Sequence, residues 1–241
     1  MRFPLSWKIN MKLEICANSY QSAKNACDAG AHRIELCQEL SVGGITPSYG
    51  LIKKVIEELD IPVFVLIRPR SGNFVYSDNE FQIMKTDIQL CKDLGCNGIV
   101  SGVLKSDNTL DVERTKVLID FAKPLPFTFH RAFDEVKNPK ETLLQLIELG
   151  ADRVLTSGQK TTAEEGLELL KELNVLAENK IKILAGGGVS SKNARLFKQA
   201  GLDEIHTSAS TTKAEDNSMF SMPLTFSDPI KIKAILDAIS K

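Results

Sequence analysis

The sequence predicts a single (β/α)8 barrel, known as a TIM barrel, from three observations. First, eight short runs rich in β-branched residues recur along the chain, at residues 12–16, 33–37, 63–68, 98–101, 127–130, 153–157, 182–185 and 204–208. Second, each gap between two runs holds one amphipathic, helix-like stretch, which is the pattern of repeated βα units around a parallel sheet. Third, the chain has 241 residues, close to the about 250 that are typical of this fold.

Local signals mark where the helices start and stop. A capping side chain precedes a proline at Thr46 with Pro47, at Asn138 with Pro139 and at Asp228 with Pro229. Ser77 and Glu80 have the spacing of a capping box. A glycine follows a helix-like stretch and precedes the next run at four equivalent places, Gly30, Gly95, Gly150 and Gly201. These signals support the division into βα units, whereas residues 211–225 show no clear periodicity.

Composition limits the classes of function. Met11 opens the first run, so residues 1–10 are expected to be an N-terminal extension, disordered or not native, and residues 11–241 the barrel domain. The chain has 43% apolar residues and a net charge of −1, as in an ordinary globular protein with one large core. No basic patch and few aromatic residues argue against nucleic-acid binding.

No signal peptide or bilayer-length apolar run is recognisable, so no membrane association is expected. Five cysteines without a secretion signal favour the reducing cytoplasm, and a homo-oligomer is left open.

The barrel interior is expected to carry charges where Val, Ile and Leu are usual. Side chains alternate along a strand, so each run should present one set of residues to the interior. On that basis the inward set comprises Glu14, Cys16, Glu35, Cys37, Leu66, Arg68, Thr128, His130, Thr156, Glu204, His206 and Ser208. Buried ions require partners or a use, because desolvation costs several kcal/mol per ion. Two interpretations stay open: a structural network of paired charges, and a functional site at the carboxyl ends of the strands.

The candidate catalytic residues are Glu35, Arg68, His130, Glu14 and His206. We expect Glu35 beside Arg68 to be ionised and therefore a poor base, which leaves His130 as the proton-transfer group near neutral pH. Arg68 would bind a substrate anion, and a carboxylate near His130 would fix its tautomer.

The stretch 128–134 adds Arg131 and Asp134 beside His130. For these two residues the structural alternatives are an Asp134 helix cap and an Arg131 ion pair with a neighbouring loop.

An anion site is predicted after the seventh and eighth strands, where TIM barrels often bind phosphate. The seventh run leads into Gly186, Gly187 and Gly188 ahead of a helix, and the eighth leads into Ser208, Ala209 and Ser210. Glycines also serve tight turns, so the argument depends on the position of the two loops together. The expected partner is a small-molecule or phosphate-bearing ligand.

Six segments resemble the CutC family, known as copper homeostasis proteins. They are ELC at 35–37, GGITPS at 43–48, IRPR at 67–70, YSD at 76–78, TFHRAFD at 128–134 and LTSGQK at 155–160, within a likeness that runs from about residue 12 to residue 210. The resemblance implies a cytoplasmic TIM barrel that is associated with copper tolerance and with Cu(I) binding.

Cu(I) prefers soft thiolate ligands, so the cysteines are the candidate metal ligands. Cys16 and Cys37 end neighbouring strands, whereas Cys27, Cys91 and Cys96 lie on or just after helices and resemble small buried hydrophobes. Three functions therefore remain: a copper-handling protein that uses Cys16 and Cys37, an enzyme for a small phosphorylated or carboxylated metabolite, and a ligand-binding sensor without chemistry.

Overall fold

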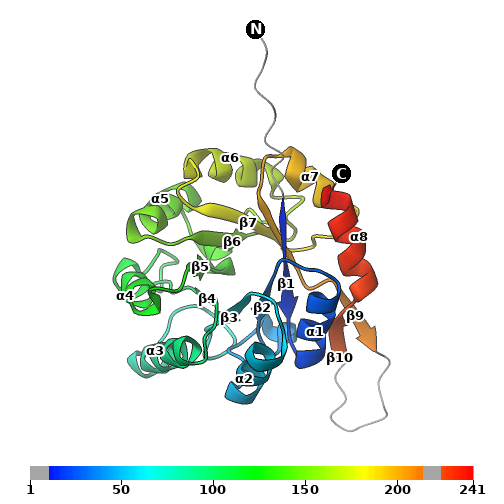
Figure 1. Ribbon diagram of the computed structural model, residues 1–241. Helices are drawn as coiled ribbons and strands as arrows, with labels where there is room; N and C mark the ends of the chain where they lie inside the picture. Colours follow the sequence, from blue (N-terminus) through cyan, green and yellow to red (C-terminus); the bar gives the residue numbers. More distant parts are fainter. Residues whose placement is uncertain (1–10, 214–223, 241) are drawn as a thin grey trace.

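The protein folds as a closed eight-stranded parallel barrel with helices on its outside (Figure 1). The computed structural model describes residues 11–213 and 224–240, and the expected extension at residues 1–10 lies outside them. The strands are β1 (Lys12–Ala17), β2 (Arg33–Leu36), β3 (Val63–Leu66), β4 (Gly98–Ser101), β5 (Phe127–Phe129), β6 (Arg153–Thr156), β7 (Lys182–Gly186) and β8 (Glu204–Thr207). Each strand pairs in parallel with the next, and β8 closes on β1. The predicted (β/α)8 barrel is confirmed.

One helix follows each barrel strand and packs against the outside of the sheet (Figure 1). The helices are α1 (Tyr20–Asp28), α2 (Tyr49–Glu58), α3 (Asp78–Asp93), α4 (Val112–Ala122), α5 (Pro139–Leu149), α6 (Leu167–Ala177), α7 (Ala194–Gln199) and α8 (Pro229–Ser240), with short 3-10 helices η1 (Leu40–Val42) and η2 (Arg131–Glu135). Among the described residues, no helix has the length and apolar character needed to cross a membrane.

Most of the predicted helix boundaries are confirmed. Ser77 and Glu80 form the complete capping box of α3, and α5 and α8 begin at the prolines. The prediction at Thr46 with Pro47 is wrong, because α2 starts later with Ser48 as its N-cap. Thr46 is instead bonded to the chain beyond β3: its N–H donates to the Arg68 carbonyl, and its Oγ1 accepts from the Arg68 N–H. That pairing holds Thr46 in extended backbone.

Part of the aperiodic segment 211–225 is ordered as a two-stranded antiparallel sheet. Strands β9 (Ser210–Lys213) and β10 (Leu224–Ser227) pair with each other beside the barrel (Figure 1). Asn18 at the end of β1 donates to the Thr225 carbonyl at 3.1 Å, which fixes β10 next to α1. The remainder of the segment lies outside the described residues.

The core has two layers that follow from the alternation of side chains along the strands. Outward residues such as Ile15, Ile34 and Val65 are fully buried in the large apolar layer between sheet and helices. The inside of the barrel is instead largely polar, with Glu14 and Arg33 both buried.

The predicted interior position of Thr156 is wrong. Arg153, the inward residue of β6, lies in register with Thr128, and its Nε–H donates to Thr128 Oγ1 at 3.2 Å. Leu155, two residues later, lines the cavity at the barrel mouth. Thr156 therefore points to the other face, where its hydroxyl donates to Asp134.

Candidate metal and ligand site at the barrel mouth

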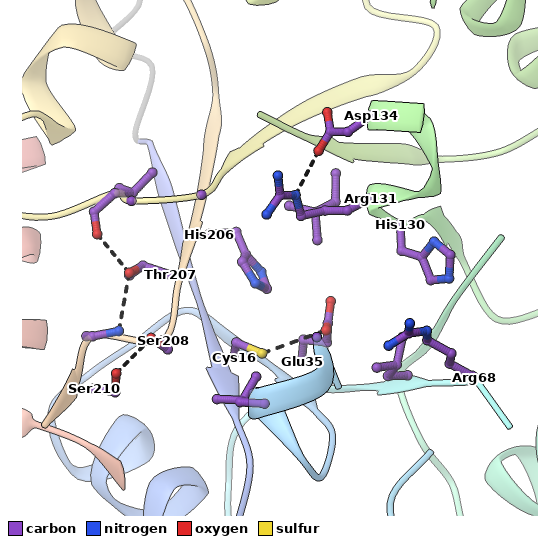
Figure 2. Close-up of a pocket in the computed structure, with 18 of the residues that line it drawn as sticks. Cys16, Glu35, Arg68, His130, Arg131, Asp134, His206, Thr207, Ser208 and Ser210 are labelled. Carbon is purple, nitrogen blue, oxygen red and sulfur yellow. Dashed lines mark hydrogen bonds and ion pairs between the residues drawn. The ribbon is translucent and has the colours of Figure 1, made fainter. Parts of the chain in front are cut away.

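A cavity of about 850 Å³ opens at the carboxyl ends of the barrel strands (Figure 2). It collects most of the residues that the sequence singles out: Cys16, Glu35, Arg68, His130, His206, Gly187, Gly188, Ser208, Ala209 and Ser210. Three others, Glu14, Cys37 and Gly186, are not part of its lining. Parallel strands end at one rim of a barrel, which is why residues so distant in sequence meet here.

The thiol groups of Cys16 and Cys37 lie side by side below the cavity floor. Their Sγ atoms are 3.5 Å apart, and the Cys16 thiol also donates weakly to Glu35 Oε1 at 3.8 Å. Both cysteines are free and buried. The pairing follows from the barrel register, in which Cys16 lies opposite Glu35 on the adjacent strand. Ligand atoms of Cys16, Glu35 and His206 all lie within 4.8 Å of one another, so the group has the proximity that a metal site requires.

His206 is held as a cation at this floor. Its Nδ1 lies 2.7 Å from Glu14 Oε1, and both side chains are buried. Burial alone would lower the pKa of His206, but contacts with Cys16, Glu14 and Glu35 raise it well above its ordinary value. The imidazolium therefore compensates part of the negative charge that a thiolate or carboxylate would develop at the floor.

The protonation states of Glu35 and His130 differ from those expected, whereas their roles in catalysis remain predictions. Burial raises the pKa of Glu35 to about 7, although the charge of His206 works against that shift. Burial, together with the charge of Arg68, lowers the pKa of His130 to about 3. Glu35 thus titrates near neutral pH, whereas His130 remains an uncharged imidazole.

Arg68 does not form the expected pair with Glu35. Its guanidinium donates to three backbone carbonyls, at Val42 (2.8 Å), Gly44 (2.6 Å) and Gly72 (2.8 Å). These carbonyls belong to the loops after β2 and β3, so Arg68 joins the two loops. It thereby leaves the Glu35 carboxyl without the opposite charge that was expected to keep it ionised.

His130 has a defined tautomer. Its Nδ1 accepts a hydrogen bond of 3.1 Å from the Ala132 N–H, as the N-cap of η2. A neutral imidazole that accepts at Nδ1 carries its proton on Nε2. Among the described residues that Nε2–H has no hydrogen-bond partner. The ring packs against Phe74, with centroids 4.8 Å apart.

Asp134 has a different role from the predicted helix cap. It lies inside η2 and accepts hydrogen bonds from the N–H groups of Ser157 and Gln159 in the loop after β6. Arg131 donates to Asp134 at 2.7 Å and to Ser157 Oγ at 2.9 Å, and both side chains border the cavity. The two residues therefore tie η2 to the neighbouring loop, and Arg131 also brings a cation to the cavity wall.

The predicted anion loops border the same cavity on its other side. Gly187 and Gly188 adopt the left-handed φ values of 108° and 71°, which disfavour any other residue. The described residues supply no hydrogen-bond partner to the N–H groups of Gly188 and Val189. Opposite them, Ser208 Oγ donates to Ser210 Oγ at 3.2 Å (Figure 2). Gly186 is instead the last residue of β7, packed against His206 and Leu155.

A buried charge network fills the barrel interior beneath the cavity. Arg33 donates to Glu14 and, at 2.5 Å, to Glu204. Burial would raise the pKa of Glu14, but Arg33 and His206 lower it to about 2. For Glu14 and Glu204 these contacts therefore support the structural interpretation, in which the interior charges pair with one another. Sequence reasoning did not include Arg33, although it lies two positions before Glu35 and so on the same face of its strand.

Two cavity residues are not among the predicted site residues. Lys231 comes from the first turn of α8, beyond the eight predicted strands, and donates to the Ser210 carbonyl at 2.6 Å. Arg131 is in the predicted stretch 128–134, where an ion pair with a neighbouring loop is the structural alternative to anion binding. Both add positive charge to the mouth.

The site thus defines a TIM-barrel protein with a thiol, carboxyl and imidazole cluster at the floor of a cationic cavity. Residues 11–211 match the model of the CutC family. The chain belongs to the CutC family, as the six sequence segments indicate.

Named relatives agree with this assignment. The chain is 48% identical to a family protein CutC of Pasteurella multocida (strain Pm70), over 82% of each protein. It is 47% identical to the human protein named copper homeostasis protein cutC homolog, over 83% of this chain and 74% of that one. The crystal structure of a Streptococcus agalactiae protein described as a copper homeostasis protein CutC superposes with a TM-score of 0.78, at 37% identity, and covers 82% of this chain and 98% of that one.

Proposed function

We propose that the protein acts in copper homeostasis in the cytoplasm by binding Cu(I) between the thiol groups of Cys16 and Cys37. The observation that carries this proposal is the 3.5 Å separation of the two Sγ atoms on adjacent strands. Cu(I) is a soft ion that prefers thiolate ligands. The names of the human and Streptococcus agalactiae relatives support copper as the metal.

The residues around the two thiols fit a monovalent soft cation. Both thiols are free and buried, and His206 lies within reach of the same point, where its imidazolium would release the Nε2 proton on binding the ion. Its contacts with Glu14 anchor the imidazole at Nδ1. Ligand orientation by a carboxylate of this kind is usual in metal sites.

Metal binding must displace protons from these thiols. The hydrogen bond to Cys37 raises the pKa of Cys16 well above its ordinary value, and burial and Glu35 act in the same direction. Cu(I) would therefore replace a proton that the Cys16 thiol otherwise retains, and the charge of the ion would compensate the charge of the thiolates. Affinity for Cu(I) is expected to rise with pH.

The test is a titration of the reduced protein with Cu(I) against a chromogenic Cu(I) chelator. We expect one ion per chain, and we expect Cys16→Ser with Cys37→Ser to abolish most of the binding. The chain offers a matched control in its other pair of buried cysteines, Cys91 and Cys96. The variant Cys91→Ser with Cys96→Ser should bind Cu(I) as the unchanged protein does.

Circular dichroism and thermal unfolding establish that both double variants are folded. Undiminished Cu(I) binding in the Cys16 and Cys37 variant would exclude these ligands. Equal affinity for Zn(II) and Cu(I) would contradict selection by soft ligands.

A further inference from the structure

Arg68 is a buried cation without a carboxylate partner. Only 6% of the residue is exposed, and its three hydrogen bonds all go to uncharged backbone carbonyls. Arg33 and His206 differ, since Arg33 pairs with two glutamates and His206 pairs with Glu14. Arg153 is less buried than Arg68 but resembles it, because it too has no carboxylate partner and a buried donor without an acceptor among the described residues. Within the described residues no ion pair neutralises Arg68. An uncompensated buried charge costs several kcal/mol, so a counter-ion at this place would be strongly favoured.

Arg68 also has donors to spare. A guanidinium has five N–H donors, and the three carbonyl contacts use two at Nη1 and one at Nη2. The N–H of Nε is buried and forms no hydrogen bond within the described residues. The Tyr76 hydroxyl, also buried and without a partner there, lies nearby: burial raises the pKa of Tyr76, and the charge of Arg68 acts against that shift. One Nη2 donor likewise remains. Two adjacent donors of a guanidinium match the two oxygens of a carboxylate or phosphate.

His130 supplies a third unpartnered donor on the same wall of the cavity. The residue is 4% exposed, and its Nε2–H meets no acceptor in the described part of the chain. Buried donors without partners are rare in folded proteins and call for an explanation such as a ligand. Arg68 and His130 both line the cavity, on the side away from Cys16 and His206 (Figure 2).

The size of the cavity also favours an organic ligand. About 850 Å³ is far more than one metal ion between two thiols needs, and it lies within the range of small-molecule sites. The mouth adds Arg131, Lys231 and the N–H groups of Gly188 and Val189, which have no hydrogen-bond partner within the described residues. The lining also includes three acidic residues, Glu35, Asp134 and Glu135, of which Asp134 is engaged by Arg131 and by the loop after β6.

We propose that the cavity binds a small organic oxyanion, a carboxylate or a phosphate ester, whose anionic group is held by Arg68 and His130. The remainder of the ligand extends toward the loop at Gly188 and the mouth cation Arg131. This binding function is separate from Cu(I) binding, because neither Arg68 nor His130 contacts the two thiols. The anion supplies the charge that Arg68 lacks and the acceptor that His130 lacks.

Three probes on one carbon skeleton separate the sources of the oxyanion. Glycerate carries a carboxylate, glycerol 3-phosphate carries a phosphate, and glycerol carries neither. Binding is measured by isothermal titration calorimetry and by the shift in melting temperature, at low and high salt. We expect at least one anion to bind and glycerol not to bind, because only the anions provide charge for the guanidinium.

Variants assign the binding to these two residues. Arg68→Met removes the charge and should weaken the bound anion at least about tenfold, the scale of a charge-assisted contact. His130→Asn retains an acceptor for the Ala132 N–H but loses the Nε2 donor, and should also weaken binding. The matched control is Arg70→Met, since Arg70 also holds loop carbonyls but lies outside the cavity lining.

The outcomes are distinct. Binding of either anion that Arg68→Met and His130→Asn weaken and Arg70→Met preserves supports the proposal. Absence of binding by both anions overturns it, as does equal affinity in all three variants or an equal loss with Arg70→Met. His130→Asn leaves the loop contacts of Arg68 in place. If Arg68→Met does not fold, the anion affinity of His130→Asn therefore decides whether the proposal stands. The variant Cys16→Ser with Cys37→Ser should bind the anion within about threefold of the unchanged protein, so failure of one proposal is distinguishable from failure of the other.

Discussion

Glu14 and His206 face each other across the seam where β8 closes on β1, with His206 Nδ1 2.7 Å from Glu14 Oε1. The same glutamate also accepts from Arg33, which reaches on to Glu204. A chain of alternating charges thus runs through the barrel interior, beside a small apolar cluster that includes Phe64 and Leu66. Its upper end, His206, lines the floor of the cavity, so the packing of the barrel and the chemistry of its mouth share residues.

Removal of Arg33 should destabilise the protein strongly. The variant Arg33→Met leaves Glu14 and Glu204 buried without their common cation, and breaking a buried ion pair in this way costs about 3 to 5 kcal/mol. Urea unfolding at neutral pH measures the loss. The control is Lys24→Met, which removes an exposed pair with Asp28 and should change the free energy of unfolding far less. Similar losses for the two variants would show that the interior charges are not a connected network.

The ring of Phe64 should make β4 intolerant of a side chain at Gly98. A Cβ at Gly98 would lie 2.4 Å from the Phe64 ring, which is itself held between the guanidinium groups of Arg33 and Arg153. We therefore expect Gly98→Ala to destabilise the protein by about 1 to 3 kcal/mol through overpacking. The same change at Gly50, in the open first turn of α2, should stabilise by about 0.5 to 1 kcal/mol. If the Phe64 ring cannot move, thermal unfolding should show a lower melting temperature for Gly98→Ala and a higher one for Gly50→Ala.

The strands and helices were predictable because their signals are local. Left-handed glycines such as Gly30 and Gly150 end helices in the structure as in the sequence pattern. The phase of a short strand is less secure, since an error of one residue moves a side chain to the other face. That is how Thr156 was assigned to the interior in place of Leu155.

The identity of the cavity residues was largely predictable, but their partners were not. Arg68 and His130 lie one or two residues beyond their strands, where alternation still indicates the interior. The acceptors of Arg68 are carbonyls of loops at 42–44 and at 72, and backbone geometry of this kind leaves no trace in residue types. The protonation states of Glu35 and His130 depend on those partners, so they were assigned in reverse. The pair β9 and β10 is not predicted, because each strand has only four residues and the first, STTK, lacks an apolar alternation.

Asp134 should control the order of the loop after β6. It accepts from the Ser157 and Gln159 N–H groups, and Asp134→Ala would leave these donors without their acceptor. The expected loss is about 1 to 3 kcal/mol in the free energy of unfolding. Hydrogen exchange should also become faster at both amides. Asp107→Ala, which removes two exposed turn contacts with Thr109, serves as the control and should have little effect. Unchanged exchange at Ser157 and Gln159 would contradict this role.

His130 should make the protein less stable in mild acid. Burial and the charge of Arg68 lower the pKa of His130 to about 3, against an ordinary value of 6.5. Below pH 6.5 the unfolded chain binds a proton at this residue that the folded protein does not, so the free energy of unfolding falls as the pH decreases toward 3. Between pH 7.5 and pH 5.0 this residue alone should account for about 2 kcal/mol, at about 1.4 kcal/mol per pKa unit.

The variant His130→Asn isolates this contribution, since asparagine has no proton to gain and retains an acceptor for the Ala132 N–H. Urea unfolding of both proteins at several pH values gives two stability profiles. Their difference should shrink by about 2 kcal/mol between pH 7.5 and pH 5.0, because only the unchanged protein pays the protonation penalty. A constant difference across that range would mean that His130 takes up its proton in the folded protein at the same pH as in the unfolded chain. The Nε2–H donor would then persist, but Nδ1 would no longer accept from the Ala132 N–H below that pH.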